Sequence, residues 1–275
     1  MIDWFEATLL GVVQGATEFL PVSSSGHLVI GQHLFGLREP ALLFDIALHV
    51  ATLFAVLWYY RREILELLRE SALGLGGLLE GRSWSEIQAA YPAFRLAWLI
   101  VIGTVPTALI GIGFEDSFER LFGSLRTVGF MLIVTGLILL LTRIAPRGHK
   151  GIAGMGVIDA LLVGLVQGLA ITPGISRSGS TIVAALLLGV ERETAARYSF
   201  LLSVPSIIGA LLLKLGDAGN GVGLTATALG FFAALVTGYF CLVFLVHVVK
   251  RGRLAWFAPY CLVVGLLALA LARSP

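Results

Sequence analysis

The chain has little charge for its size: Asp, Glu, Lys and Arg make up 13% of its 275 residues, whereas 57% are hydrophobic. A soluble domain carries about 25% charged residues, so this composition excludes an ordinary globular domain. The net charge is only +2 and no Lys/Arg run resembles a nucleic-acid-binding patch, so we expect no nucleic-acid partner. The two cysteines, Cys241 and Cys261, lie in apolar stretches without metal-ligand spacing, which indicates core residues rather than a disulfide framework or a zinc site.

Long apolar runs make up much of the chain, and about 20 apolar residues are enough for a helix to cross a membrane. Two apolar regions, 7–35 and 157–188, are each interrupted midway by proline, glycine and serine. Non-helical backbone at membrane depth must be satisfied by protein or a wet cavity, so we expect two re-entrant helical hairpins. Six further runs are predicted to be full crossings: residues 42–60, 96–114, 128–141, 198–213, 222–249 and 255–271.

The segment 61–91 differs from these runs because charged residues, such as Arg62, Glu66 and Arg69, stand among its leucines. This pattern predicts an amphipathic helix at the membrane interface, followed by a loop. Gly74, Gly76 and Gly77 have no phosphate-loop pattern around them, so we expect them to form a flexible turn.

The distribution of Lys and Arg orients the crossings, because cytoplasmic loops are enriched in both. The best arrangement leaves few cations outside and predicts that both termini face outward. The cytoplasmic set is Arg61, Arg62, Arg69, Arg82, Arg143, Arg147, Lys150, Arg192, Arg197, Lys250, Arg251 and Arg253. The outer set is Arg38, Arg120, Arg126, Lys214 and Arg273.

An internal repeat relates the two hairpins. One constant offset aligns residues 11–15 (GVVQG) with 164–168 (GLVQG), and 23–26 (SSSG) with 176–179 (SRSG). Each half holds one hairpin and three crossings, and an odd number of crossings inverts the second copy relative to the first. The sequence therefore predicts an all-α integral membrane protein with an inverted repeat. It forms a single domain, 1–275, with halves at about 1–145 and 154–275.

The first hairpin places polar groups inside the membrane. Gln14 and Glu18 are four residues apart and share one helix face, while Gly11 and Gly15 allow close helix packing. Pro21 then ends the half-helix, and the break before the next one reads Ser-Ser-Ser-Gly-His.

The second hairpin repeats this design. Pro173 and Gly174 end its first half-helix, and residues 176–181 (SRSGST) open the second. If the two half-helix N-termini converge near the bilayer midplane, they offer positive dipole ends, hydroxyls and Arg177 to one small site. Such a site would suit a phosphate group.

Each candidate also has a structural interpretation. An ionisable group at membrane depth costs about 2–4 kcal/mol, which favours function for Glu18 and Arg177 over a purely structural ion pair. Gln14 could instead bridge helices, and Ser24 or Ser176 could be simple N-caps. His27 beside the break is more readily explained by function than as a core histidine. Three groups are expected to be structural: Asp45, His49 and Asp159.

The paired motifs resemble the undecaprenyl-diphosphate phosphatase family of bacterial membranes. They read Gln14-Gly-Ala-Thr-Glu18, then Phe-Leu-Pro-Val-Ser-Ser-Ser-Gly-His27, and Pro173-Gly-Ile-Ser-Arg177-Ser-Gly-Ser-Thr181. The resemblance spans nearly the whole chain. It implies hydrolysis of undecaprenyl diphosphate to the monophosphate and phosphate, recycling the lipid carrier of cell-wall (peptidoglycan) synthesis, and lowered sensitivity to bacitracin. It also implies a multi-pass protein of the inner (plasma) membrane that needs a divalent cation. Gln14 stands where many members of the family have glutamate, which lowers the expected metal affinity.

On this hypothesis Glu18 and Gln14 hold Mg²⁺ or Ca²⁺, Arg177 clamps phosphoryl oxygens, and Ser24 is the candidate nucleophile. His27 would relay its proton or attack directly, and both routes stay open. The remaining substrate-binding candidates are Ser23, Ser25, Gly26, Ser176, Ser178, Gly179 and Thr181.

The alternative function is a transporter or flippase of a phosphorylated lipid carrier, because broken helices in inverted repeats also build transporters. The site is expected to face outward, since the first hairpin enters from that side. The sequence does not decide whether the protein forms a homodimer.

Overall fold

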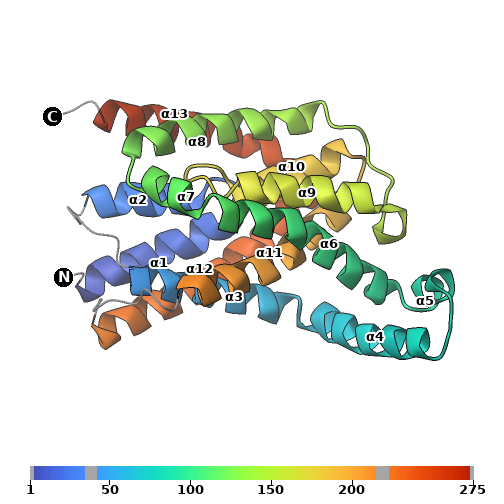
Figure 1. Cartoon of the computed structure of the whole chain (residues 1–275). Helices are drawn as coiled ribbons and strands as arrows, with labels where there is room; N and C mark the ends of the chain where they lie inside the picture. The colour runs from blue at the N-terminus through green and yellow to red at the C-terminus, as the bar shows by residue number, and fades with distance from the viewer. Residues whose placement is uncertain (1–2, 35–41, 215–222, 273–275) are drawn as a thin grey trace.

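The computed structural model describes residues 3–34, 42–214 and 223–272, and these are almost entirely helical (Figure 1). The helices before the second hairpin are α1 Trp4–Phe19, α2 Ser24–Leu34, α3 Leu42–Tyr59, α4 Arg61–Leu79, α5 Trp84–Ala90, α6 Pro92–Gly113, α7 Glu115–Phe122 and α8 Leu125–Leu140. The later ones are α9 Val157–Leu169, α10 Arg177–Leu187, α11 Arg192–Lys214, α12 Leu224–Lys250 and α13 Ala258–Leu271, and short 3₁₀ turns are η1 Leu141–Arg143, η2 Ile152–Gly154 and η4 Leu254–Phe257. The predicted segment ends Phe35 and Val222, the cations Arg38 and Arg273, and the side chain of Lys214 lie outside the described residues.

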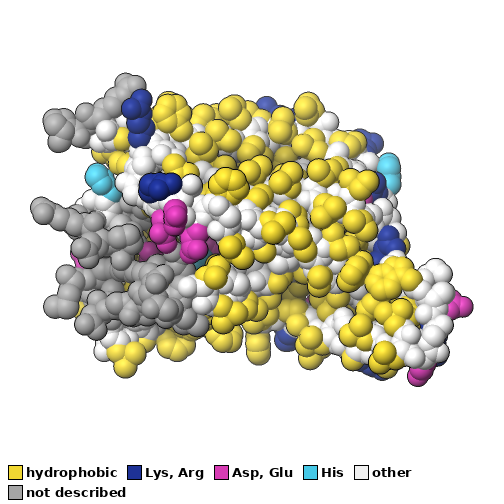
Figure 2. Space-filling model, viewed as in Figure 1, with side chains coloured by type: hydrophobic (Ala, Val, Ile, Leu, Met, Phe, Trp, Pro, Cys, Tyr) yellow, Lys and Arg dark blue, Asp and Glu magenta, His cyan; other side chains and the backbone are white. Residues whose placement is uncertain are grey.

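Five helical segments of the described chain are long and apolar enough to cross a membrane: Pro92–Gly113, Leu125–Arg143, Arg192–Leu213, Leu224–Lys250 and Leu254–Leu271. The sixth predicted crossing corresponds to α3, whose apolar part Phe44–Tyr59 is shorter. Figure 2 shows one face of the molecule, with hydrophobic side chains across its middle and charged side chains nearer its two ends. The exposed apolar side chains, such as Leu109, Phe240 and Leu266, would be costly in water and suit contact with lipid. The chain is therefore a multi-pass membrane protein, as predicted.

Both predicted hairpins are present. The half-helices α1 and α2 enter from the end of the molecule where α1 begins and α13 ends, whereas α9 and α10 enter from the opposite end (Figure 1). Each break contains a residue with a positive φ: +70° at Ser23 in the first hairpin and +95° at Gly174 in the second. A β-carbon at Gly174 would come within 2.6 Å of the carbonyl oxygen of Val128, so glycine is required there.

Glycines allow very close packing between pairs of helices. A β-carbon on Gly11 of α1 would overlap the carbonyl of Gly230 on α12, and one on Gly164 of α9 would overlap the carbonyl of Gly103 on α6. Gly11 and Gly164 correspond in the sequence repeat, and α1 packs on α12 as α9 packs on α6. This arrangement is consistent with an inverted repeat, and the boundaries of the two halves stay a prediction.

The helical part of the interfacial segment is longer than predicted. Gly74, Gly76 and Gly77 lie inside α4 and form no turn, so that prediction is wrong. A β-carbon at Gly74 would come within 2.7 Å of the Phe94 ring, and one at Gly77 within 3.3 Å of Ile87. These glycines therefore let α4 pack against α6 and α5, which offsets their low helix propensity. The position of α4 at the membrane interface stays a prediction.

The cations assigned to the cytoplasm lie on elements that meet at one end of the molecule. These elements are α4, η1 and the loop after it, the start of α11 and the end of α12 (Figure 1). This grouping agrees with the predicted topology, and which end is cytoplasmic stays a prediction.

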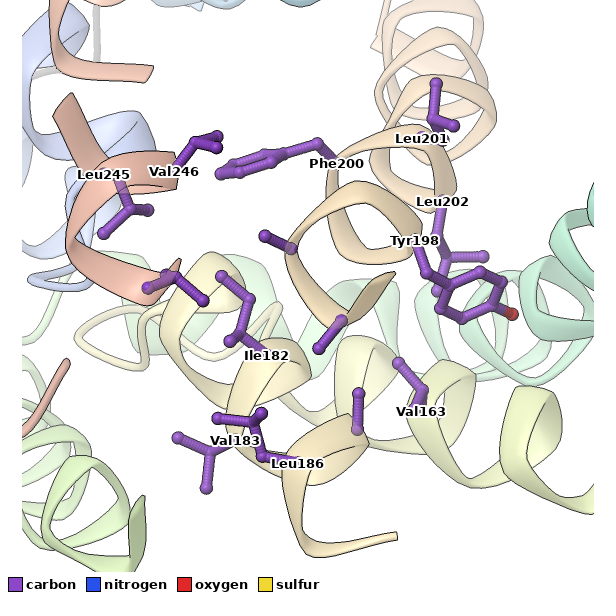
Figure 3. Close-up of a cluster of buried hydrophobic side chains, with 14 of the residues drawn as sticks. Val163, Ile182, Val183, Leu186, Tyr198, Phe200, Leu201, Leu202, Leu245 and Val246 are labelled. Carbon is purple, nitrogen blue, oxygen red and sulfur yellow. The ribbon is translucent and has the colours of Figure 1, made fainter. Parts of the chain in front are cut away.

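A buried apolar cluster surrounds the first half of α11 and fixes α10 beside it. Figure 3 shows Ile182, Val183 and Leu186 of α10 in this cluster, and Phe200 of α11 pointing toward Val246 of α12. The hydroxyl of Tyr198 donates to the carbonyl of Leu99 at 2.8 Å, which ties α11 to α6. Since α10 begins at Arg177, this packing also determines where that arginine lies.

Candidate active site

Glu18 is the centre of the site. It lies in the last turn of α1 with a relative exposure of 6%. The amide Nε2 of Gln14 donates to its Oε2 at 3.0 Å, and the hydroxyl of Ser24 donates to the same oxygen at 2.5 Å. Its other oxygen, Oε1, is paired with Nη2 of Arg177. The two hairpins therefore contribute to one polar cluster, as the sequence predicts.

Two polar atoms of this cluster have no hydrogen-bond partner within the described chain. They are Nη1 of Arg177 and Oε1 of Gln14, both fully buried. A buried donor or acceptor without a partner costs about 1–3 kcal/mol, so such groups indicate a ligand that completes them. The free Arg177 nitrogen can donate to a phosphoryl oxygen, and the free Gln14 oxygen can bind a hard cation.

A small cavity adjoins the Glu18–Arg177 pair. Its volume of about 10 Å³ holds roughly one water molecule, and α10 and α11 supply Ser178, Ser199 and Ser203 to its wall. The hydroxyl of Ser178 donates to the carbonyl of Phe19 at 2.9 Å, which joins the second hairpin to the end of α1. The cavity beside the pair is thus lined by three serine residues together with Phe19 and Phe200.

His27 is held by two groups of its own. Its Nδ1 donates to the carbonyl of Ser23 at 2.8 Å, because a carbonyl can only accept. Its Nε2 lies 2.8 Å from the hydroxyl of Tyr260, and the two rings stack with centroids 5.7 Å apart. Among the contacts of the described residues, Ser24 is joined to Glu18 and none joins it to His27.

The predicted substrate-binding residues lie at the two tips, which touch. A β-carbon at Gly26 would come within 3.2 Å of the Cα of Gly174. Several of these residues make local contacts within the described chain. At the first tip, the Ser23 hydroxyl accepts from Gly26 N at 3.3 Å and lies 3.3 Å from the Ser25 hydroxyl. At the second, Ser176 caps α10 by accepting from Gly179 N at 3.1 Å, and the Thr181 and Ser199 hydroxyls lie 2.5 Å apart. A role of any of them toward substrate stays a prediction.

Four residues near the site were not predicted to be functional from the sequence: His49, Tyr260, Ser199 and Ser203. Nε2 of His49 lies 3.9 Å from Oε2 of Glu18. One signal could have found it, since a histidine one helical turn after Asp45 is unusual in an apolar crossing. Tyr260 and the two serines come from α13 and α11, far from the motifs, and have no such signal.

The other two polar groups have structural partners, as expected. Both carboxylate oxygens of Asp45 accept from Gln32 at 3.0 Å. Asp159 accepts from Gly156 N at 2.9 Å at the start of α9 and pairs with Lys150 at 3.0 Å.

The donors available to a metal ion are few. No group of three or more His, Cys, Asp or Glu side chains that could hold a metal occurs in the described residues. Glu18 and the unpaired oxygen of Gln14 fit a divalent cation only if other ligands, such as diphosphate oxygens or water, complete its shell.

Comparisons with known proteins agree with the motifs. The family described as Bacitracin resistance protein BacA matches residues 7–267. The chain is 48% identical over 274 residues to the undecaprenyl-diphosphatase of Desulforapulum autotrophicum, with 98% of each chain covered. It is 46% identical over 273 residues to that of Carboxydothermus hydrogenoformans (97% of each), and 40% over 269 residues to that of Methanobrevibacter smithii (97% of this chain, 96% of the relative).

Proposed function

Because the chain belongs to the family of the bacitracin resistance protein BacA, we propose that it is an undecaprenyl-diphosphatase. It hydrolyses undecaprenyl diphosphate to undecaprenyl monophosphate and phosphate, which returns the lipid carrier to cell-wall polymer synthesis. The observation that supports this function most directly is the contact of Glu18 with both Ser24 and Arg177, where the two hairpins touch.

The contacts of Ser24 support a covalent route. Its hydroxyl oxygen attacks the terminal phosphorus while its proton passes to Oε2 of Glu18, the carboxylate oxygen to which it already donates. The bond between that phosphorus and the bridging oxygen breaks, and undecaprenyl monophosphate leaves. Water then hydrolyses the serine phosphate and releases inorganic phosphate.

Arg177 and His27 have different parts in this proposal. The unpaired Nη1 of Arg177 donates to a phosphoryl oxygen and stabilises the negative charge that grows there in the transition state. His27 has one ring nitrogen engaged by the Ser23 carbonyl and the other near Tyr260, so the contacts favour Glu18 over His27 as the group that activates Ser24.

The cation belongs to the same proposal. Glu18 and the free amide oxygen of Gln14 would hold Mg²⁺ or Ca²⁺ together with oxygens of the diphosphate. When bound, the ion supplies positive charge that offsets the charge of the diphosphate and of the leaving group.

The predicted topology indicates the side of the membrane on which the reaction takes place. The first hairpin enters from the end where α1 begins, which the arginine distribution predicts to be outside, so we expect hydrolysis at the outer face of the plasma membrane. The four catalytic candidates come from one chain, so the proposal requires no homodimer. The transporter alternative is disfavoured because a hydroxyl bonded to a buried carboxylate exceeds what phosphate binding needs.

The test is phosphate release from undecaprenyl diphosphate by the purified protein in detergent, with and without divalent cation. We expect cation-dependent release that falls by about 10²–10³ in Glu18→Ala and in Arg177→Ala. Arg126→Ala, at an exposed arginine outside the site, is the matched control and should keep wild-type activity. No release from well-folded wild type would overturn the proposal and favour the transporter.

A further inference from the structure

A second polar cavity lies at the arginine-rich end of the molecule. Its volume is about 270 Å³, far larger than the roughly 10–15 Å³ that is enough for one water molecule. Arg147 and Arg192 line it, and buried Leu186, Val249 and Leu254 form its apolar wall. No acidic side chain is among the described residues that line it.

The cavity is distinct from the catalytic site. Arg177 begins α10 and Leu186 stands near its other end, nine residues on, which is about 14 Å along a helix. A ligand here would therefore not contact Glu18 or Ser24.

The two arginines are unpaired, while the acidic groups around them have partners. In the part of the chain that the structure describes, neither Arg147 nor Arg192 makes a side-chain hydrogen bond or ion pair. Glu193 pairs with Lys250 at 2.9 Å, and Glu191 accepts from the Thr194 hydroxyl at 2.6 Å. The cavity thus keeps a local positive charge with no internal counter-ion.

The backbone positions the loop of Arg147 and leaves room for the guanidinium of Arg192. The loop that carries Arg147 is joined to the turn after α10, because the amides of His149 and Lys150 both donate to the carbonyl of Gly189 at 3.1 Å. Gly252 has a φ of +68°, and a β-carbon there would come within 2.5 Å of Cζ of Arg192. The guanidinium of Arg192 therefore lies against bare backbone, in a space that only glycine leaves open.

From these features we propose that the cavity binds the phosphate headgroup of an anionic membrane lipid. Two guanidinium groups match a phosphate in charge and geometry, since each can donate a pair of hydrogen bonds. The apolar wall suits the glycerol and first methylene groups of a lipid better than it suits a free phosphate ion. The arginine-rich end is also where anionic lipids would be attracted to a membrane protein.

The test is titration of the purified protein in detergent with dihexanoyl phosphatidic acid, with inorganic phosphate and dihexanoyl phosphatidylcholine as separate arms. We expect phosphatidic acid to bind more tightly than either. Arg147→Gln/Arg192→Gln should weaken phosphatidic acid binding by about tenfold or more and leave hydrolysis unchanged. Gly252→Ala should weaken it too, because the new methyl group displaces Arg192.

Two control variants show whether the bound lipid occupies this cavity. Arg62→Gln/Arg69→Gln removes the same charge from exposed positions on α4 and should leave binding intact. Arg177→Ala disables the catalytic site and should also leave it intact, so the result does not depend on the proposed reaction. Equal affinity in the Arg147/Arg192 double variant and wild type would overturn the site. Inorganic phosphate or phosphatidylcholine binding as tightly as phosphatidic acid would overturn the lipid assignment.

Discussion

Gln14 gives the site an amide oxygen where a second carboxylate would bind a cation more strongly. Its Nε2 donates to Glu18 and its Oε1 has no partner in the described chain. We expect Gln14→Glu to lower the Mg²⁺ or Ca²⁺ concentration needed for half-maximal hydrolysis, because a carboxylate adds one negative ligand. The measurement is phosphate release during a cation titration of chelator-treated protein.

The matched control for that change is Gln88→Glu, the same substitution beside Arg95 and away from the hairpins. It should leave the cation dependence unchanged. A Gln14→Glu variant that needs as much cation as wild type would show that position 14 is not a ligand.

Ser24 and Ser25 are neighbours with different contacts, which makes them a matched pair. The Ser24 hydroxyl donates to Glu18, whereas the Ser25 hydroxyl contacts that of Ser23. We expect Ser24→Ala to lower kcat by at least about 10²-fold, and Ser25→Ala to change it far less. A phosphoserine trapped by acid quenching should appear in wild type and be absent in Ser24→Ala.

The result also decides between the two routes left open by the sequence. If Ser24→Ala turns over at the wild-type rate while His27→Ala does not, the histidine is the nucleophile and the serine route is wrong.

For single residues, the sequence shows which polar side chains lie inside the membrane, but it does not show most of the residues they contact. Glu18 and Arg177 are found because a charge inside the membrane is costly. Their pairing, across 159 positions of the chain, follows only from the repeat that brings the two tips together. His49 and Tyr260 reach the site from other helices; the histidine is unusual in an apolar crossing, but nothing in the local sequence links it to Glu18, and Tyr260 carries no comparable cost.

At the scale of helices, the breaks were predictable because proline, glycine and serine interrupt otherwise apolar runs. The glycines of α4 were not, because glycine marks either a turn or a close helix contact. At Gly74 the ring of Phe94 occupies the space that a side chain would need. That neighbour is 20 positions away on another helix, so the local sequence could not show which of the two applies.

The close helix pairs yield a stability prediction. A methyl group at Gly11 or Gly164 would overlap the backbone of the facing helix, so Gly11→Ala and Gly164→Ala should each cost about 1–3 kcal/mol. Gly209→Ala, on α11 with open space beside it, is the control and should be neutral or slightly stabilising.

Thermal unfolding in detergent measures this difference, with Tm falling by roughly 2–4 °C for each kcal/mol. If all three variants unfold at the same temperature, the close approach of α1 to α12 and of α9 to α6 is wrong.

At the scale of the whole molecule, the hairpins enter from opposite ends and one end carries most of the Lys and Arg residues (Figure 1). Charge bias predicts that this end faces the cytoplasm, with the first hairpin opening outward. Glu80, after α4, and Asp116, on α7, are exposed residues on elements of the two different ends. We expect Asp116→Cys to react with a membrane-impermeant maleimide added to intact cells, and Glu80→Cys to react only after the membrane is opened.

The wild-type chain is the control, because its own cysteines are buried or partly buried and should give little background. The opposite labelling pattern would show that the membrane orientation is the reverse of the predicted one, with the first hairpin on the cytoplasmic side. It would also place the cavity of Arg147 and Arg192 in the outer leaflet. The expected pattern puts hydrolysis on one face and the proposed lipid site on the other, so one labelling experiment constrains both.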